Sequence, residues 1–183
     1  MRRLSVDEFR ETCPDAIGSE DAAAVSAIIA EVRKSGDAAL REFTRRFDRV
    51  EIGQLAVGAD EIASAARRAD PGLVAAMREA AENIRTFARC QMKAFVDFEV
   101  EIRPGVFAGQ AVVPIARAGA YVPGGRYPLV STLLMAAIPA LTAGVREIVV
   151  CTPPGPDGAV PPAILAAAEL CGVREVFRVG GAQ

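Results

Sequence analysis

Apolar residues in the first part of the chain recur with the period of an α-helix. Residues 19–36 predict one helix, which is opened by the capping residue Ser19 and two acidic residues and is ended by Gly36. Its apolar positions fall at i, i+3, i+4 and i+7, as one buried face requires: Val25, Ile28, Ile29 and Val32. A second helix is predicted to begin at Asp37, with three residues facing inward: Leu40, Phe43 and Phe47.

The helical pattern continues in a third stretch. It is expected to begin near Asp60 and to restart after Asp70, because Pro71 suits the first turn of a helix. Its inner face is expected to be formed by Leu73, Met77, Ile84 and Phe87.

An alternating pattern then replaces the helical one. Residues 98–102 alternate apolar and polar side chains, which indicates a half-buried strand. Pro104 and Gly105 are typical of a turn, and a second strand is expected within residues 106–115. We therefore predict a β-hairpin.

The last part of the chain alternates short apolar strands with apolar helices. Strands are predicted at 118–122, 146–152 and 175–179, and helices at 131–143 and 163–171. This β-loop-α-β-α-β order implies a parallel sheet with right-handed crossovers. A parallel sheet needs cover on both faces, so without a following helix Val176, Phe177 and Val179 are expected to lie partly exposed. We therefore expect the chain to be a segment of a longer protein, or to be completed by another chain.

Charge and composition narrow the possible functions. The 183 residues are 51% hydrophobic, which excludes a disordered chain. The net charge of -2 gives no strong electrostatic attraction to nucleic acid or to an anionic membrane surface. No uncharged apolar run is long enough to predict a membrane span. The chain has no histidine, so it cannot by itself form a Ser-His-Asp triad or a His-ligated zinc site. Its four cysteines form no metal-binding spacing and are interpreted as reduced thiols of a cytoplasmic protein.

Two glycine-bearing loops follow strands of the predicted sheet. One contains Tyr121, Pro123, Gly124 and Gly125, and the other contains Gly180 to Gln183. Ligands of open α/β sheets bind beyond the carboxyl ends of the strands, where glycines allow close approach of the backbone.

The helix after the first loop could bind a phosphate through its free N–H groups, with help from Arg126, Ser131 and Thr132. The alternative is that the glycines only form tight turns and that Tyr121 is a core residue with a satisfied hydroxyl.

Three stretches of the sequence resemble the histidinol dehydrogenase family. They are RPGVFAGQAVVPIARAG, GAYVPGGRYPLVSTLLMAAIPALTAGVREIVVCTPP and ELCGVREVFRVGGAQ. The resemblance is strong over residues 103–183, and the helical first part fits the family in outline.

The resemblance implies an enzyme that oxidises L-histidinol to L-histidine with NAD, assisted by zinc, in histidine biosynthesis. Tyr121 and Gln183 match residues of the family that contact NAD, and Pro123, Gly124 and Gly125 would belong to the same cofactor site. The resemblance also implies a small-molecule substrate, a cytoplasmic location and a homodimer with exchanged segments, with neither nucleic acid nor membrane as a partner.

The fold class implied is α/β, with a helical N-terminal region and a β-hairpin leading into an incomplete Rossmann-like parallel sheet. We expect an N-terminal arm at 1–18, the helical region with the hairpin at 19–117, and the start of the NAD-binding domain at 118–183. Charge supports a change of character near this boundary, since residues 1–103 hold 35 charged side chains and residues 104–183 hold 9.

The chain also departs from the family. The family's proteins are more than twice as long, and their zinc ligands and catalytic Glu-His pair lie beyond the equivalent of Gln183. We assign no catalytic or metal-binding residue to this chain and expect it to be inactive alone.

Two alternatives for the function stay open. The first is a related NAD-dependent dehydrogenase of another small alcohol such as sulfopropanediol, suggested by Arg126, Tyr127 and Pro128. The second is a non-catalytic module for nucleotide binding or dimerisation.

Overall fold

The structure is a computed structural model that describes residues 19–124 and 127–183. Its helices are α2 (Ser19–Ser35), α3 (Asp37–Phe43), the π-helical turn η1 (Thr44–Asp48), α4 (Ala59–Arg68), α5 (Pro71–Met92), α6 (Val130–Thr142) and α7 (Pro162–Cys171). Its strands are β1 (Phe98–Arg103), β2 (Val106–Gln110), β3 (Arg117–Tyr121), β4 (Glu147–Thr152) and β5 (Glu175–Arg178). The predicted order of helices and strands is confirmed. None of the helices in these ranges is long and apolar enough to cross a membrane.

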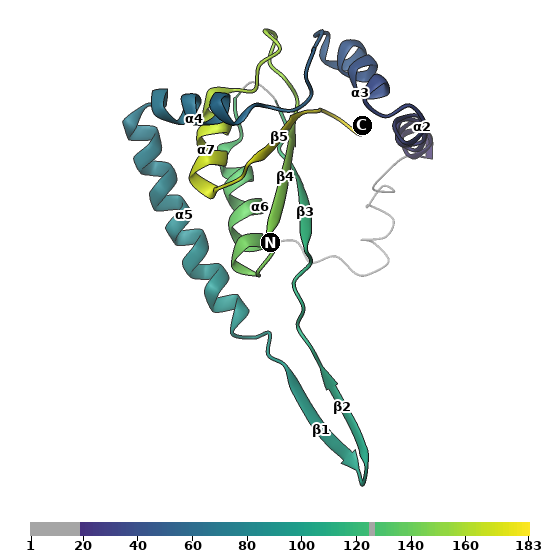
Figure 1. Cartoon of the computed structure of the whole chain (residues 1–183), viewed down its shortest axis with the longest axis vertical. Helices are drawn as coiled ribbons and strands as arrows, with labels where there is room; N and C mark the ends of the chain where they lie inside the picture. Colours follow the sequence, from purple (N-terminus) through teal and green to yellow (C-terminus); the bar gives the residue numbers. More distant parts are fainter. Residues whose placement is uncertain (1–18, 125–126) are drawn as a thin grey trace, which may run out of the picture.

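Three parallel strands form the sheet that organises the molecule. The strands lie in the order β3-β4-β5, and their register aligns Tyr121 with Cys151 and Cys151 with Phe177. Helices α4 to α7 lie together on one side of this sheet, whereas α2 and α3 lie on the other side (Figure 1). The α/β fold class with a parallel sheet and a separate hairpin is therefore confirmed.

The core lies between the sheet and the four helices. Side chains of β4 alternate, so Ile148 and Val150 are buried against the helices. Leu133 and Leu134 of α6 are at most 1% exposed, and the hydrophobic cluster continues into α4 and α5 through Ile62 and Met77. One core thus joins the helices on both sides of the expected 117/118 boundary, and that boundary stays a prediction.

An N-terminal segment covers the outer edge of β5. The Val57 N–H donates to the Val176 carbonyl, and the Arg178 N–H donates to the Leu55 carbonyl, both at 2.8 Å. The Arg178 side chain strengthens this contact through both carboxylate oxygens of Glu61. The expectation that the apolar side chains of this strand lie partly exposed is wrong for Val176 and Val179, which are buried, and Val176 belongs to the hydrophobic cluster formed with the helices. It is confirmed for Phe177, which is partly exposed.

The turn η1 changes the pitch of the second predicted helix. Thr44 is fully buried, and its hydroxyl donates to the Leu40 carbonyl at 2.9 Å. Phe47 keeps to the face of Phe43, since the two rings stack at 5.7 Å. It is nevertheless 48% exposed, because η1 packs chiefly on α3. The expected inward position of Phe47 is wrong.

Two further expectations about apolar faces are wrong in part. The buried face of α5 contains Met77, Ala81 and Ala88, and Phe87, which lies one position off this face, is 66% exposed. In α2, Val25 and Ile29 are 39% and 37% exposed, because α2 packs chiefly on the short helix α3.

The β-hairpin is present but is not half-buried. Strands β1 and β2 pair antiparallel and project away from the rest of the fold (Figure 1), and every residue of β1 is exposed. The second strand ends at Gln110, short of the expected limit. Alternation in β1 produces an apolar face formed by Phe98, Val100 and Ile102, each of which is more than half exposed. None of the described elements covers this face.

Pro153 joins the loops that follow all three strands of the sheet. It follows β4 directly, and its ring lies between Gly124, after β3, and Gly180, after β5. A Cβ atom at Gly124 would lie 2.3 Å from Pro153 Cγ, and a Cβ atom at Gly180 would lie 2.8 Å from Pro153 Cβ. Both glycines are therefore required for the proline to pack where it does.

This packing predicts a specific rescue. Gly124→Ala should lower the free energy of unfolding by about 1–3 kcal/mol, because the new methyl group overlaps the proline ring. Adding Pro153→Ala removes Cγ and should restore much of that loss, whereas it should not rescue Gly180→Ala, whose clash is with Cβ. Urea denaturation of the full-length protein measures these differences as a double-mutant cycle.

The matched control is Gly119→Ala in β3, where an added Cβ meets no atom within 4 Å. Equal destabilisation of all three glycine positions would contradict the role assigned to Pro153.

Candidate functional site

The two glycine-bearing loops lie side by side at the carboxyl edge of the sheet. Tyr121 is the last residue of β3, and its hydroxyl oxygen accepts a hydrogen bond of 3.0 Å from the Gly181 N–H in the loop after β5. The ring lies on the sheet face away from α6 and α7, since Ala118 and Ala120 pack into the core and Tyr121 alternates with them. Tyr121 is 46% exposed, so its hydroxyl has a partner in the protein while its ring stays accessible.

Gln183 brings unused hydrogen-bonding capacity to the same place. Its amide oxygen and its amide nitrogen are both buried and have no hydrogen-bond partner among the described residues. Gly181, with φ at +64°, turns the chain so that the Gln183 side chain folds back beside it. A buried side-chain amide without partners is unfavourable, and a ligand with donors and acceptors would satisfy it.

The first loop is described in part. Pro123 is partly buried and Gly124 is exposed, and both follow the fully buried Val122. Gly125 and Arg126, which we assigned to ligand binding from the sequence, lie outside the described residues. The helix α6 that follows the loop has no side-chain cap at its N-terminus, so its first N–H groups have no side-chain partner there.

Asp48, which is absent from the candidate residues predicted from the sequence, approaches the second loop from the N-terminal region. A Cβ atom on Gly180 would lie 3.2 Å from Asp48 Oδ2 and 3.3 Å from Oδ1. Oδ2 is buried and has no partner among the described residues, and burial raises the pKa of the Asp48 carboxyl above its ordinary value. No local pattern marks this residue, because its position depends on contacts between segments far apart in the sequence.

Cys151 occupies the middle strand in register with Tyr121 and Phe177. Burial raises the pKa of the Cys151 thiol above its ordinary value, so the thiol stays protonated at neutral pH. It can therefore contribute packing beside the site but not a nucleophilic thiolate.

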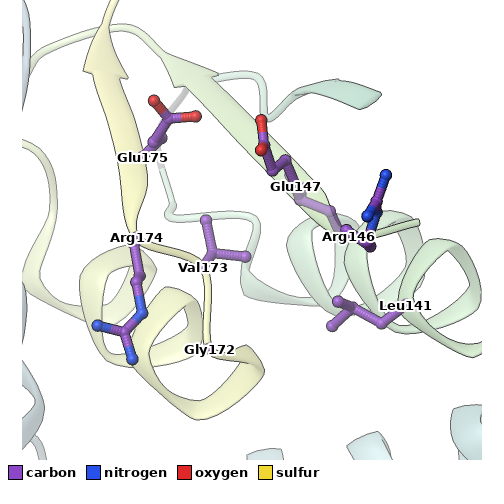
Figure 2. Close-up of a pocket in the computed structure, with 8 residues that line it drawn as sticks. Leu141, Arg146, Glu147, Gly172, Val173, Arg174 and Glu175 are labelled. Atoms are coloured by element: carbon purple, nitrogen blue, oxygen red, sulfur yellow. The ribbon is translucent and has the colours of Figure 1, made fainter. Parts of the chain in front are cut away.

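A cavity of about 400 Å³ lies at the opposite edge of the sheet. Figure 2 shows its lining, in which Arg146 and Glu147 come from the start of β4 and Arg174 and Glu175 from the start of β5. Ligands of parallel sheets bind at the carboxyl ends of the strands, and this cavity lies at the amino ends. It is therefore separate from the site formed by Tyr121 and Gln183.

Acidic and sulfur side chains do not gather into a metal site in residues 19–124 and 127–183. Within these ranges, no group of three or more His, Cys, Asp or Glu side chains is placed to hold a metal ion. The arrangement at the carboxyl edge instead offers an aromatic face, an amide, a carboxylate and backbone N–H groups. These groups can bind a polar organic ligand.

Comparison with known proteins identifies relatives over nearly the whole chain. The family model described as histidinol dehydrogenase matches residues 15–183. The chain is similar to the histidinol dehydrogenase of Methanothermobacter thermautotrophicus, with 48% identity over 100% of this chain and 42% of that protein. The histidinol dehydrogenase of Xanthomonas axonopodis pv. citri is 51% identical over 87% of this chain and 37% of that protein.

A solved structure agrees with these matches. The crystal structure of histidinol dehydrogenase from Elizabethkingia anophelis superposes with a TM-score of 0.85 and 32% identity, over 98% of this chain and 42% of that one. The chain thus spans less than half the length of the relatives it matches. On sequence and fold together, the chain belongs to the histidinol dehydrogenase family.

Proposed function

We propose that this chain is the NAD-binding part of an enzyme that oxidises L-histidinol to L-histidine. The observation that carries the proposal is the meeting of Tyr121 with the Gly181 loop, beside the unpartnered amide of Gln183. Family membership supplies the reaction class, since the relatives named above are histidinol dehydrogenases. That common name also favours histidinol over another small alcohol as the substrate.

Each side chain of the site has a distinct task in this proposal. The exposed face of the Tyr121 ring offers a surface for stacking a base, and the Gln183 amide both donates and accepts hydrogen bonds. The uncapped N-terminus of α6 would face the pyrophosphate, with Pro123, Gly124 and Gly125 forming the loop between. When bound, NAD supplies the hydride acceptor, while these residues orient it.

The remaining chemistry would come from polypeptide outside this chain. We propose that zinc holds the alcohol substrate there, because the family uses zinc and the described residues offer no cluster of ligands for it. The catalytic acid and base would lie there too. This chain would then fix the cofactor against a substrate held by the rest of the protein.

We also propose a cytoplasmic homodimer in which segments are exchanged. The apolar face of the hairpin, formed by Phe98, Val100 and Ile102, needs a protein partner, because exposed apolar patches of this kind mark interaction surfaces. The free thiols of Cys90 and Cys151 support a reducing compartment.

Removing the Tyr121 ring tests the cofactor site. Tyr121→Ala in the full-length protein should raise the dissociation constant and the KM for NAD by about 10–100-fold, because stacking of a base on an aromatic ring contributes about 1–3 kcal/mol. Tyr121→Phe keeps the ring and should have a smaller effect. Calorimetry and steady-state kinetics measure both constants.

The control for this substitution is Phe87→Ala, which removes an exposed aromatic ring from α5, away from the proposed site. Unchanged NAD affinity in Tyr121→Ala, or an equal loss in Phe87→Ala, would show that the site is assigned wrongly.

A second prediction concerns the chain by itself. Residues 1–183 produced alone should show no formation of NADH from L-histidinol, even with zinc and NAD added, because no catalytic acid-base pair or zinc site is assigned to them. The increase in absorbance of NADH measures this, with the full-length protein as the positive control. Turnover above the background rate would refute the division of roles proposed here.

A further inference from the structure

Asp48 carries a carboxylate oxygen that the fold leaves without a partner. Oδ2 is buried, and the carboxyl group lies against Gly180 in the loop that also holds Gly181 and Gln183. A buried carboxylate oxygen that accepts no hydrogen bond is unfavourable compared with one in water. Nothing in the packing of the described residues requires this cost.

The neighbouring cations do not neutralise this carboxylate. Three arginines lie within four residues of it in the sequence. Arg45 pairs with Glu42, and Arg46 lies over the ring of Phe47 at 5.2 Å from its centroid. Arg49 forms no ion pair with Asp48 within the described part of the chain. The carboxylate therefore keeps its charge free for another donor.

The local backbone holds Asp48 in this position. Asp48 ends the π-helical turn η1, and the next residue, Arg49, has a left-handed conformation with φ at 59°. Both features are uncommon, and π-helical turns and left-handed non-glycine residues concentrate at functional sites. The buried Thr44 fixes the start of the same turn.

Asp48 and Gln183 lie beside consecutive residues of the Gly180–Gly181 turn and present complementary groups. The glycine contacts place the Asp48 carboxylate beside Gly180 and Gln183 Oε1 beside Gly181. An ionised carboxylate only accepts hydrogen bonds, whereas the amide both donates and accepts. A phosphate would be repelled by the carboxylate, but a pair of neighbouring hydroxyl groups would donate to it and also bond to the amide.

We propose that Asp48 is a cofactor-binding residue that accepts hydrogen bonds from the hydroxyl groups of a ribose of the dinucleotide. This inference rests on the proposed function, because it assumes that NAD binds at the carboxyl edge of the sheet. It adds that a ribose lies over the Gly180–Gly181 turn, with the pyrophosphate directed away from Asp48 toward the N-terminus of α6.

Replacing the carboxylate by an amide of the same size tests the proposal. Asp48→Asn in the full-length protein should weaken NAD binding about 10–100-fold, because a hydrogen bond to a charged group is lost. The melting temperature of the ligand-free protein should stay the same or rise, because the buried charge without a partner is removed. Calorimetry measures the NAD affinity, and thermal unfolding measures the melting temperature. The control variant Asp60→Asn, on the exposed start of α4, should leave the NAD affinity unchanged.

Ligand analogues test the same contact without changing the protein. NAD analogues that lack one ribose hydroxyl should bind wild-type protein more weakly, and the analogue that removes the Asp48 contact should lose no further affinity in Asp48→Asn. The fragments AMP and NMN identify which ribose is bound, since only the fragment carrying it should respond to Asp48→Asn.

The outcomes separate this inference from the proposed function. If Tyr121→Ala weakens NAD binding but Asp48→Asn does not, the role of Asp48 is wrong and the cofactor site stands. If Asp48→Asn lowers the melting temperature and leaves NAD affinity unchanged, Asp48 is a structural residue and the inference is overturned. Absence of any NAD binding to the wild-type protein would instead refute the proposed function.

Discussion

The contact of the Pro153 ring with Gly124 and Gly180 is the constraint on which the rest of the structure depends. Each of these residues follows a different strand of the sheet, so one apolar contact sets the spacing of three loops. Interiors are packed closely enough that an added methyl group on either glycine would push the loops apart. The hydrogen bond between Tyr121 and Gly181 spans the same edge of the sheet and depends on that spacing.

The second constraint is that the N-terminal region takes part in the sheet domain. The segment before α4 pairs with β5, and Arg178 fixes it through Glu61 and the carbonyl groups of Gln54 and Ala56. Arg178 is partly shielded from water, with 12% of its side chain exposed, so these charged hydrogen bonds are stronger than surface ion pairs. The same docking brings Asp48 to the loop after β5. The candidate site thus lies where the N-terminal region meets the loop after β5.

The sequence was sufficient to predict the elements and their order, because periodicity, caps and glycine stops are local signals. It also predicted that Tyr121 and the loop of Gly181 and Gln183 lie at one edge, since the carboxyl ends of parallel strands meet there. Exposure was harder to predict. Periodicity places Phe47 on the same face as Phe43, and alternation places Phe98, Val100 and Ile102 on one face of the hairpin, but neither pattern reveals whether another element covers that face.

Asp48 shows the limit of local reasoning most clearly. Its position beside Gly180, which is distant in the sequence, depends on a pairing between residues 54–57 and β5 that no periodicity indicates. From the sequence, the glycines could serve either ligand binding or tight turns. The structure gives Gly124 and Gly180 a packing role, because both lie against the Pro153 ring. The expected division at 117/118 was supported by the fall in charge density after residue 103, whereas the hydrophobic core is continuous across it.

The pairing of residues 54–57 with β5 has a consequence for biosynthesis. The hydrogen bonds of Arg178 to Gln54 and Ala56 join residues 124 and 122 positions apart, so contacts of this kind form late. While the ribosome is still translating the sheet, helices α4 and α5 lack the surface against which their apolar sides pack. The apolar sides of these helices therefore stay exposed to solvent during synthesis until the later helices and β5 have left the ribosome and the early segment can dock.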